Sequence, residues 1–141
     1  MLINGSRCKV IDNSGALEAE IFGRYKNPIN RKPGVLSKRN ERTSVVGDVV
    51  KLAIKKVEPN KNIKKGTVSK GVIVKAVKKE RKAADACHVK YFVNAVVLVN
   101  NGDKKKKKKN YNLQPIATSI KGHVSSKVAI KEIINMSKGS I

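Results

Sequence analysis

Short runs in which apolar and polar residues alternate, separated by turn-forming residues, place the strongest constraint on the fold of this chain. The clearest run follows Gly47 and Asp48, where Val50, Leu52 and Ile54 point to one face and lysines stand on the other. A period of two is typical of a β-strand with one buried face. The pattern therefore predicts a half-buried strand that begins just after residue 48.

Comparable runs predict further strands along the chain. They cover residues 7–11, 17–21, 71–77, 89–99 and 115–120. In the second of these runs, Leu17, Ala19 and Ile21 are expected to share the buried face. Four turn formers at 12–15 predict a hairpin between the first two strands, and the Asn-Gly pair at 101–102 is a second hairpin signal.

One helix is expected near the end of the chain, over residues 125–138. Ser125 or Ser126 can cap its first turn, and Gly139 can end it. Its apolar stripe, which we expect to dock on the core, consists of Ala129, Ile130, Ile133 and Ile134.

These segments favour an all-β fold in a single domain of residues 1–141. Five or six short strands joined by hairpin turns are typical of a small closed barrel, and closure removes the exposed strand edges. Aromatic residues make up only 4% of the chain and Trp is absent, so the core must be aliphatic. Two segments without periodicity, a basic loop at 24–44 and a lysine-rich insertion at 103–112, are expected to lie outside the barrel.

The charge of the chain points to a polyanionic partner. Thirty-two Lys and Arg residues oppose ten Asp and Glu residues, which leaves a formal net charge of +22. Solubility alone requires a net charge of only about 2–8, so a solvated lysine surface is the weaker explanation. A strongly basic domain is typical of a nucleic-acid binder, while the scarcity of aromatic residues argues against a platform that stacks single-stranded bases.

The candidate RNA-binding residues are basic side chains in turns, at strand ends and on the solvent faces of strands. They are Lys9, Arg24, Arg31, Lys32, Lys38, Arg39, Lys51, Lys55, Lys64, Lys65, Lys78, Lys79, Arg81 and Lys82. Among them, the turn at 78–82 and the pair at 64–65 are expected to form the main RNA-facing surface. The unbroken lysine run at 104–109 fits a solvated tip and an RNA contact equally well, and we expect it to contribute less than its charge suggests.

The residue patterns of an enzyme or a metal site are lacking, so we expect no catalytic residue, no metal and no cofactor. Glu18 and Glu20 share a strand face, which permits a carboxylate pair, but a solvent face opposite lysines is the favoured interpretation. No Walker pattern is present, and the apolar run at 95–99 is too short for a membrane span. The residues that stand outside any recognisable catalytic or metal spacing are His88, His123, Cys8 and Cys87.

Several sequence blocks, taken together and in this order, resemble the universal large-subunit ribosomal protein L-fourteen family. The most specific is the Val-Ile-Asp-Asn-Ser-Gly-Ala block at 10–16, which is similar to the opening signature of that family. The other blocks are Val-Gly-Asp-Val-Val at 46–50, Ile-Lys-Lys at 54–56, Ile-Lys-Lys-Gly at 63–66, Lys-Gly-Val-Ile-Val at 70–74, Asn-Ala-Val-Val-Leu-Val-Asn-Asn at 94–101 and Gln-Pro-Ile-Ala-Thr at 114–118.

This resemblance implies a five-stranded β-barrel with a small helical C-terminal part and no catalysis. It implies binding to the ribosomal RNA of the large subunit, contacts with neighbouring ribosomal proteins, and a bridge to small-subunit RNA. In bacteria and mitochondria a ribosomal silencing factor docks on such proteins. The residues that the resemblance assigns to the subunit interface are Gln114, Thr118, Lys121, Lys127 and Lys131.

The chain also departs from the family pattern. Leu17 and Glu18 stand where a basic pair is usual, and Ser119 stands where the family has an arginine of the interface. Lys121 can supply a point charge there, without the planar fork of arginine. These departures, the long loop at 24–44 and the lysine insertion resemble a mitochondrial member, with the cytoplasmic ribosome as the alternative. A free-standing RNA-binding barrel, acting as a translation or RNA-chaperone factor, is the alternative function.

Overall fold

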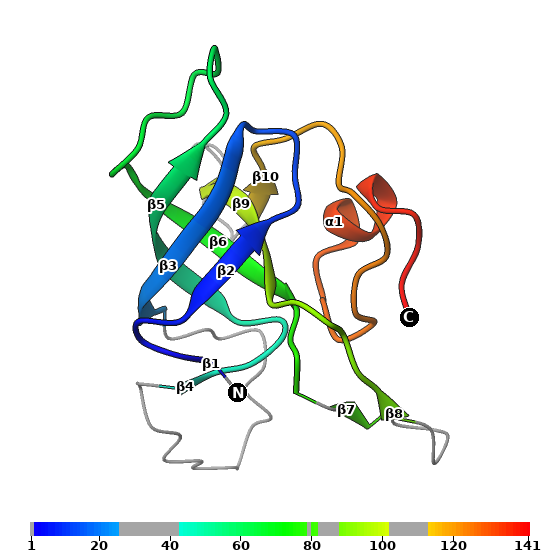
Figure 1. Ribbon diagram of the computed structural model, residues 1–141. Helices are drawn as coiled ribbons and strands as arrows, with labels where there is room; N and C mark the ends of the chain where they lie inside the picture. The colour runs from blue at the N-terminus through cyan, green and yellow to red at the C-terminus, as the bar shows by residue number, and fades with distance from the viewer. Residues whose placement is uncertain (1, 26–42, 79, 82–87, 102–112) are drawn as a thin grey trace, which may run out of the picture.

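Five strands close into a barrel in the computed structural model, which describes residues 2–25, 43–78, 80–81, 88–101 and 113–141 (Figure 1). Each strand pairs with the next in the order β9-β2-β3-β5-β6, and β6 pairs with β9 to complete the circle. Only the β2–β9 pairing within this circle is parallel. The barrel strands are β2 (Arg7–Val10), β3 (Ala16–Arg24), β5 (Val49–Val57), β6 (Val68–Lys75) and β9 (Ala95–Asn101).

Short elements extend the barrel. Strand β10 (Leu113–Pro115) adds to β9, and the helix α1 (Lys131–Met136) lies on the same side of the barrel. Two small ladders lie outside the circle of barrel strands. They pair β1 (Leu2–Ile3) with β4 (Thr43–Ser44), and β7 (Glu80–Arg81) with β8 (His88–Val89).

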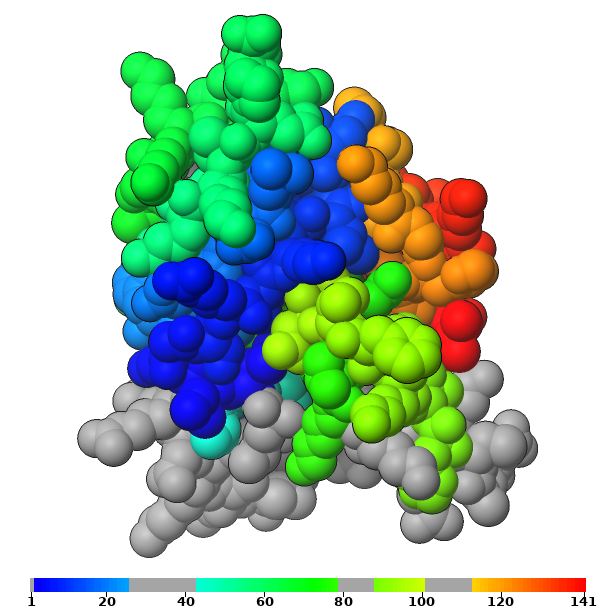
Figure 2. Space-filling view, viewed as in Figure 1, coloured from blue at the N-terminus to red at the C-terminus, as the bar shows by residue number. Residues whose placement is uncertain are grey.

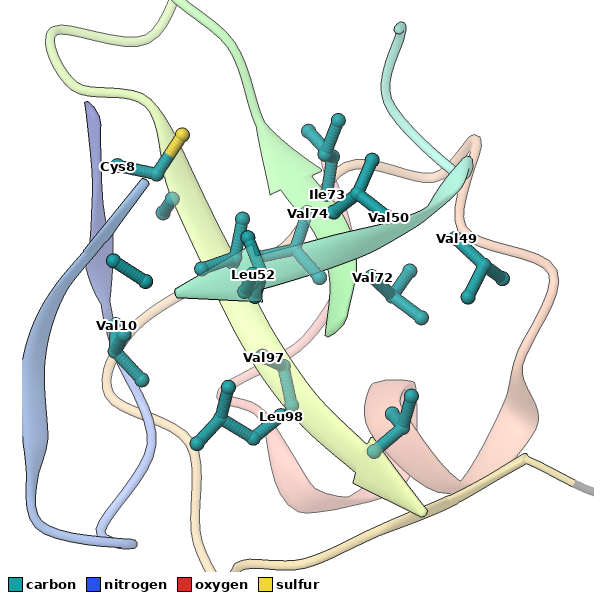
Figure 3. Close-up of a cluster of buried hydrophobic side chains, with 14 of the residues drawn as sticks. Cys8, Val10, Val49, Val50, Leu52, Val72, Ile73, Val74, Val97 and Leu98 are labelled. Atoms are coloured by element: carbon teal, nitrogen blue, oxygen red, sulfur yellow. The ribbon is translucent and has the colours of Figure 1, made fainter. Parts of the chain in front are cut away.

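The barrel interior is aliphatic, as the composition required. Val50, Leu52 and Ile54 are fully buried, which confirms the face predicted for this strand. By register, Ile73 of β6 and Leu98 of β9 lie on the same face of the sheet, and both are fully buried (Figure 3). Each fully buried aliphatic side chain contributes about 1.5–3 kcal/mol relative to an exposed one. The closed core therefore supplies a rigid frame for the exposed lysines.

The prediction that Leu17 lies on the buried face of its strand was wrong. Ala19 and Ile21 are fully buried, but Leu17 is 41% exposed. The register of β3 against β5 shifts between Ala16 and Glu18 and again before Ala19. A bulge of this kind moves a residue out of the regular alternation, so Leu17 points to solvent.

The strand expected at 89–99 is interrupted. β8 ends at Val89 and β9 begins only at Ala95. Between them, the Asn94 carbonyl accepts a hydrogen bond from the Lys9 amide (2.9 Å), and its side-chain oxygen accepts one from the Val77 amide (3.0 Å). These bonds hold the chain where it passes from the small ladder into the barrel.

The strand expected at 115–120 ends at its first residue, because β10 stops at Pro115. Beyond it, backbone amides of Thr118 and Ser119 turn toward the side chain of Asn13 instead of a strand partner. Ile120 then forms an isolated bridge with Asp12. A side chain in a distant turn thus replaces the sheet ladder that the pattern predicted.

The helix expected over 125–138 is confined to residues 131–136. Upstream, the Ser126 amide donates to the Ile141 carbonyl (2.8 Å), and Val124 exchanges bonds with Gly139 and Ile141. These bonds pair the stretch around Val124 with the end of the chain as a parallel β-bridge, so this stretch does not adopt the helical conformation. The helix begins after Ile130, which makes no side-chain cap, so neither Ser125 nor Ser126 has the capping role we predicted.

The two predicted loops lie largely beyond the described residues. The basic loop predicted at 24–44 begins at the last residue of β3 and ends at the last residue of β4. Residues 26–42, which make up most of this loop, lie outside the described part of the chain. The insertion at 103–112 is wholly outside it. Among the described residues, no helix is long and apolar enough to cross a membrane.

Candidate nucleic-acid interface

A buried carboxylate anchors the turn between β2 and β3 to the barrel. Asp12 is only 4% exposed, and its Oδ2 accepts a hydrogen bond from the Leu98 amide at 2.8 Å. Its Oδ1 accepts from the Ser14 amide at 3.0 Å and from the Ser14 hydroxyl. The acidic first residue of the turn is therefore a structural group, which ties the turn to strand β9.

The next residue, Asn13, clasps the segment that follows β10. Its amide group donates to Thr118 Oγ1 at 2.9 Å, and its side-chain oxygen accepts from the Thr118 amide at 3.1 Å. The Asn13 backbone amide donates to the Ser119 carbonyl at 3.3 Å. We call these contacts of Asn13 with Thr118 and Ser119 the turn clasp. It joins two sequence blocks that are 105 residues apart.

The turn clasp was not foreseen from the sequence. Asn13 and Thr118 lie in two of the sequence blocks that resemble one family, at 10–16 and 114–118. Their membership of these blocks was the only sequence signal that linked the two residues. Beyond the clasp, the Lys121 amide donates to the Ile11 carbonyl at 2.8 Å. The exposed side chain of Lys121 is thus carried on a backbone fixed to the barrel.

All five predicted interface residues lie in the segment that runs from β10 through α1 along one side of the barrel (Figures 1 and 2). The side chains of Gln114, Thr118, Lys121, Lys127 and Lys131 are all exposed. The Thr118 hydroxyl is already used by the turn clasp, while Lys131 opens the helix. All five residues therefore lie exposed on one continuous segment.

The basic residues predicted to form one RNA-facing surface are not brought together. Lys64 and Lys65 lie in the turn before β6, while Lys78 follows the end of that strand (Figure 1). Strand β6 has eight residues, and a rise of about 3.3 Å per residue separates its two ends by roughly 25 Å. All three lysines are exposed. The structure thus offers two separate basic ends instead of one patch.

Two lysines on the barrel wall are engaged with carboxylates. Lys56 Nζ lies 2.8 Å from Glu18 Oε1, and Lys55 Nζ lies 3.4 Å from Glu20 Oε2. The hydrogen bond from Lys56 lowers the pKa of the Glu18 carboxyl, and the charges of Lys56, Arg7 and Lys9 lower it further. The face of β3 that carries both glutamates therefore faces lysines, as the favoured interpretation of this pair expected.

Other candidate residues serve local contacts in addition to their charge. Arg24 is half-buried, and its guanidinium lies 3.5 Å from the Asp48 carboxylate and donates to the Thr43 carbonyl. Lys51 Nζ lies 5.2 Å from the centre of the Tyr25 ring, within the range of a cation–π contact. Lys9 is exposed on β2.

The remaining candidates fall outside the described part of the chain. They are Arg31, Lys32, Lys38, Arg39, Lys79 and Lys82, and the side chain of Arg81 also lies outside it. Within the described ranges, no group of three His, Cys, Asp or Glu side chains has the geometry to hold a metal ion.

The arrangement is that of an aliphatic barrel with a clasped C-terminal segment and lysines at its ends. A family model described as Ribosomal protein L14p/L23e matches residues 1–140, which is almost the whole chain. Each sequence block that suggested this family lies within the match. The chain therefore belongs to the Ribosomal protein L14p/L23e family, a family of structural proteins of the large ribosomal subunit.

Proposed function

We propose that this protein binds ribosomal RNA of the large subunit through phosphate contacts and contributes to the surface that meets the small subunit. The observation that carries the proposal is the contrast between two sets of lysines. Lys55 and Lys56 are paired with carboxylates, whereas no described carboxylate lies within ion-pair distance of Lys64, Lys65 or Lys78. These unneutralised charges stand on a rigid barrel and suit the backbone of a folded RNA.

The proposed partners follow from family membership and from the clasped segment. They are large-subunit ribosomal RNA, neighbouring ribosomal proteins, small-subunit RNA across a bridge, and a ribosomal silencing factor. Leu17, Glu18 and Ser119 differ from the residues that are usual in the family, and these differences support a mitochondrial member of the family that works in the matrix. Sedimentation tests the assignment: the protein should remain with large subunits through a high-salt wash, whereas a free-standing factor would dissociate.

Binding of the isolated protein to folded RNA is expected to weaken steeply with salt. Lysines release condensed counterions when they contact phosphates, so the logarithm of the binding constant should fall with the logarithm of salt concentration by about 0.7–0.9 per phosphate contacted. Filter binding across a salt series measures this slope. Little difference is expected between RNAs of the same shape and different sequence. A salt-independent affinity would contradict phosphate binding.

Replacing Lys121 by glutamate is expected to slow the joining of the two subunits and leave the large subunit assembled. The change reverses an exposed charge beside Ser119, where the family arginine is missing, without touching the barrel core. Light scattering with purified mutant large subunits measures the rate and extent of association. Lys121→Arg, which keeps the charge, serves as the control and should associate like wild type. Normal association of Lys121→Glu would remove this edge from the interface.

A further inference from the structure

A groove separates strand β2 from the segment that leads into β9. It has a volume of about 380 Å³ and is lined by Arg7, Lys9, Val77, Phe92, Val93 and Asn94, among others. Binding pockets for small molecules usually fall between about 300 and 1,000 Å³. Figure 2 shows β2, in blue, beside the yellow-green residues that precede β9 on this face. The groove belongs neither to the turn clasp nor to the lysines at the ends of β6.

Phe92 forms an apolar wall of the groove that nothing in the described fold covers. Its side chain is 96% exposed, and Val77 beside the same groove is 40% exposed. The chain contains only two phenylalanines, and the other, Phe22, is 45% exposed on β3. A single exposed apolar residue is ordinary, but here the ring stands at the edge of a formed groove, next to a second exposed apolar side chain.

The opposite wall of the groove is positively charged. Arg7 and Lys9 are both exposed on β2, and because they are two residues apart their side chains leave the same face of the strand. Glu18 also lines the groove, but its carboxylate is bonded to Lys56 at 2.8 Å. The pair of cations therefore leaves this wall with an excess of positive charge, which suits an anion.

The groove is preformed, because Asn94 ties its two walls together. The Asn94 carbonyl accepts from the Lys9 amide at 2.9 Å, and the Asn94 side chain accepts from the Val77 amide at 3.0 Å. Cys8 is among the lining residues, but it stands between Arg7 and Lys9 on β2, so its buried side chain points to the opposite face, into the barrel core. The backbone of the groove is therefore held in place, and its walls carry an exposed aromatic ring on one side and two cations on the other.

We propose that this groove binds one unpaired nucleotide of RNA, with its base stacked on Phe92 and its phosphate held by Arg7 and Lys9. A nucleotide is the unit that carries a flat aromatic face and an anion at short range, which are the two features that the walls offer. Paired RNA hides its base faces in the stack, so the nucleotide must be bulged or otherwise unpaired. One ring contacts one base, so the proposal requires no stacking platform. It rests on the proposed function only in taking RNA as the ligand.

The test compares two RNA hairpins of equal length and charge, one fully paired and one carrying a single bulged 2-aminopurine. Fluorescence anisotropy of the full-length protein measures both affinities at one salt concentration, and the 2-aminopurine emission reports stacking of the bulged base. Wild type is expected to prefer the bulged hairpin. Phe92→Ala should weaken binding of that hairpin by about 5-fold or more, with unchanged affinity for the paired one. Because the ring is 96% exposed, this change should leave the fold intact.

Three controls make the outcomes distinct. Phe92→Tyr keeps an aromatic face and should restore the preference, while Phe22→Ala removes the other phenylalanine and should leave it unchanged. Arg7→Gln should reduce the salt dependence of binding to the bulged hairpin. Equal, salt-dependent binding of both hairpins by wild type would overturn the groove proposal and leave RNA binding in place. Binding of neither hairpin would overturn both. If Phe92→Ala binds both hairpins like wild type and an acidic peptide competes only with wild type, the groove serves a protein partner.

Discussion

The substitution Gly71→Val is expected to destabilise the barrel severely. A Cβ atom at Gly71 would overlap the side chain of Leu52 and stand 3.1 Å from the carbonyl oxygen of Val97. Leu52 is fully buried, so any shift of its side chain disturbs the packing of its neighbours. Overpacking of a close-packed core usually costs about 1–3 kcal/mol, and the backbone carbonyl on the far side leaves little room for relief. We therefore expect Gly71→Ala to lower stability by about this amount, and Gly71→Val by more.

Thermal denaturation followed by circular dichroism measures this effect, with a shift of about 2–4 °C expected per kcal/mol in a domain of this size. Gly23 provides a matched control because it too lies in a barrel strand, β3, and has no positive φ. A Cβ atom there would meet only the Lys51 side chain, at 3.4 Å or more. Gly23→Ala should therefore change the Tm little. A wild-type Tm for Gly71→Val would show that the barrel is not closed as tightly as described.

Removal of the Asp12 carboxylate is expected to destabilise the protein and to release the turn clasp. Asp12→Ala leaves the buried Leu98 amide without its acceptor, and the Ser14 amide loses its own. An unsatisfied buried donor costs about 1–3 kcal/mol, and bonds to a charged acceptor lie at the upper end of that range. The same turn carries Asn13, so Thr118 and Ser119 lose their fixed partner when the turn moves.

Hydrogen exchange separates these two effects. Asp12→Ala should speed exchange at the Leu98 amide, since its hydrogen bond is lost. Asn13→Ala is the matched control in the same turn: it removes the side-chain bonds of the turn clasp but leaves Asp12 and Leu98 joined. It should lower stability less and preserve the protection of Leu98. Equal protection of Leu98 in both variants would mean that the carboxylate does not anchor the turn.

In β5, the local alternation of residues determined which face of the strand is buried. The run through Val50, Leu52 and Ile54 specifies its inward face because side chains in a strand alternate with a period of two. The turn formers at 12–15 predicted the first hairpin, and β2 and β3 do pair as antiparallel neighbours around that turn. The small share of aromatic residues required an aliphatic core, and the blocks at 10–16 and 114–118 identified the family. Each of these features depends on residues that are close together in the sequence.

Features that depend on distant backbone partners became visible only in the folded chain. The bulge that exposes Leu17 exists because β3 shifts register against β5, and a local pattern contains no information about a partner strand. The helix is short because the stretch around Val124 pairs with the end of the chain as a β-bridge, a pairing that a local apolar stripe cannot reveal.

For the candidate site too, the sequence indicated the kind of residue involved, and the folded chain decided where those residues lie. Composition identified lysine as the residue expected to meet RNA, but strand β6 separates Lys64 from Lys78, and no charge count predicts that distance. The turn clasp and the groove beside Phe92 each combine residues that are far apart in the chain, such as Asn13 with Thr118. Local residue patterns were thus sufficient for most of the strands, the aliphatic core and the family. Closure of the barrel, which brings distant strands into register, set which surface residues meet.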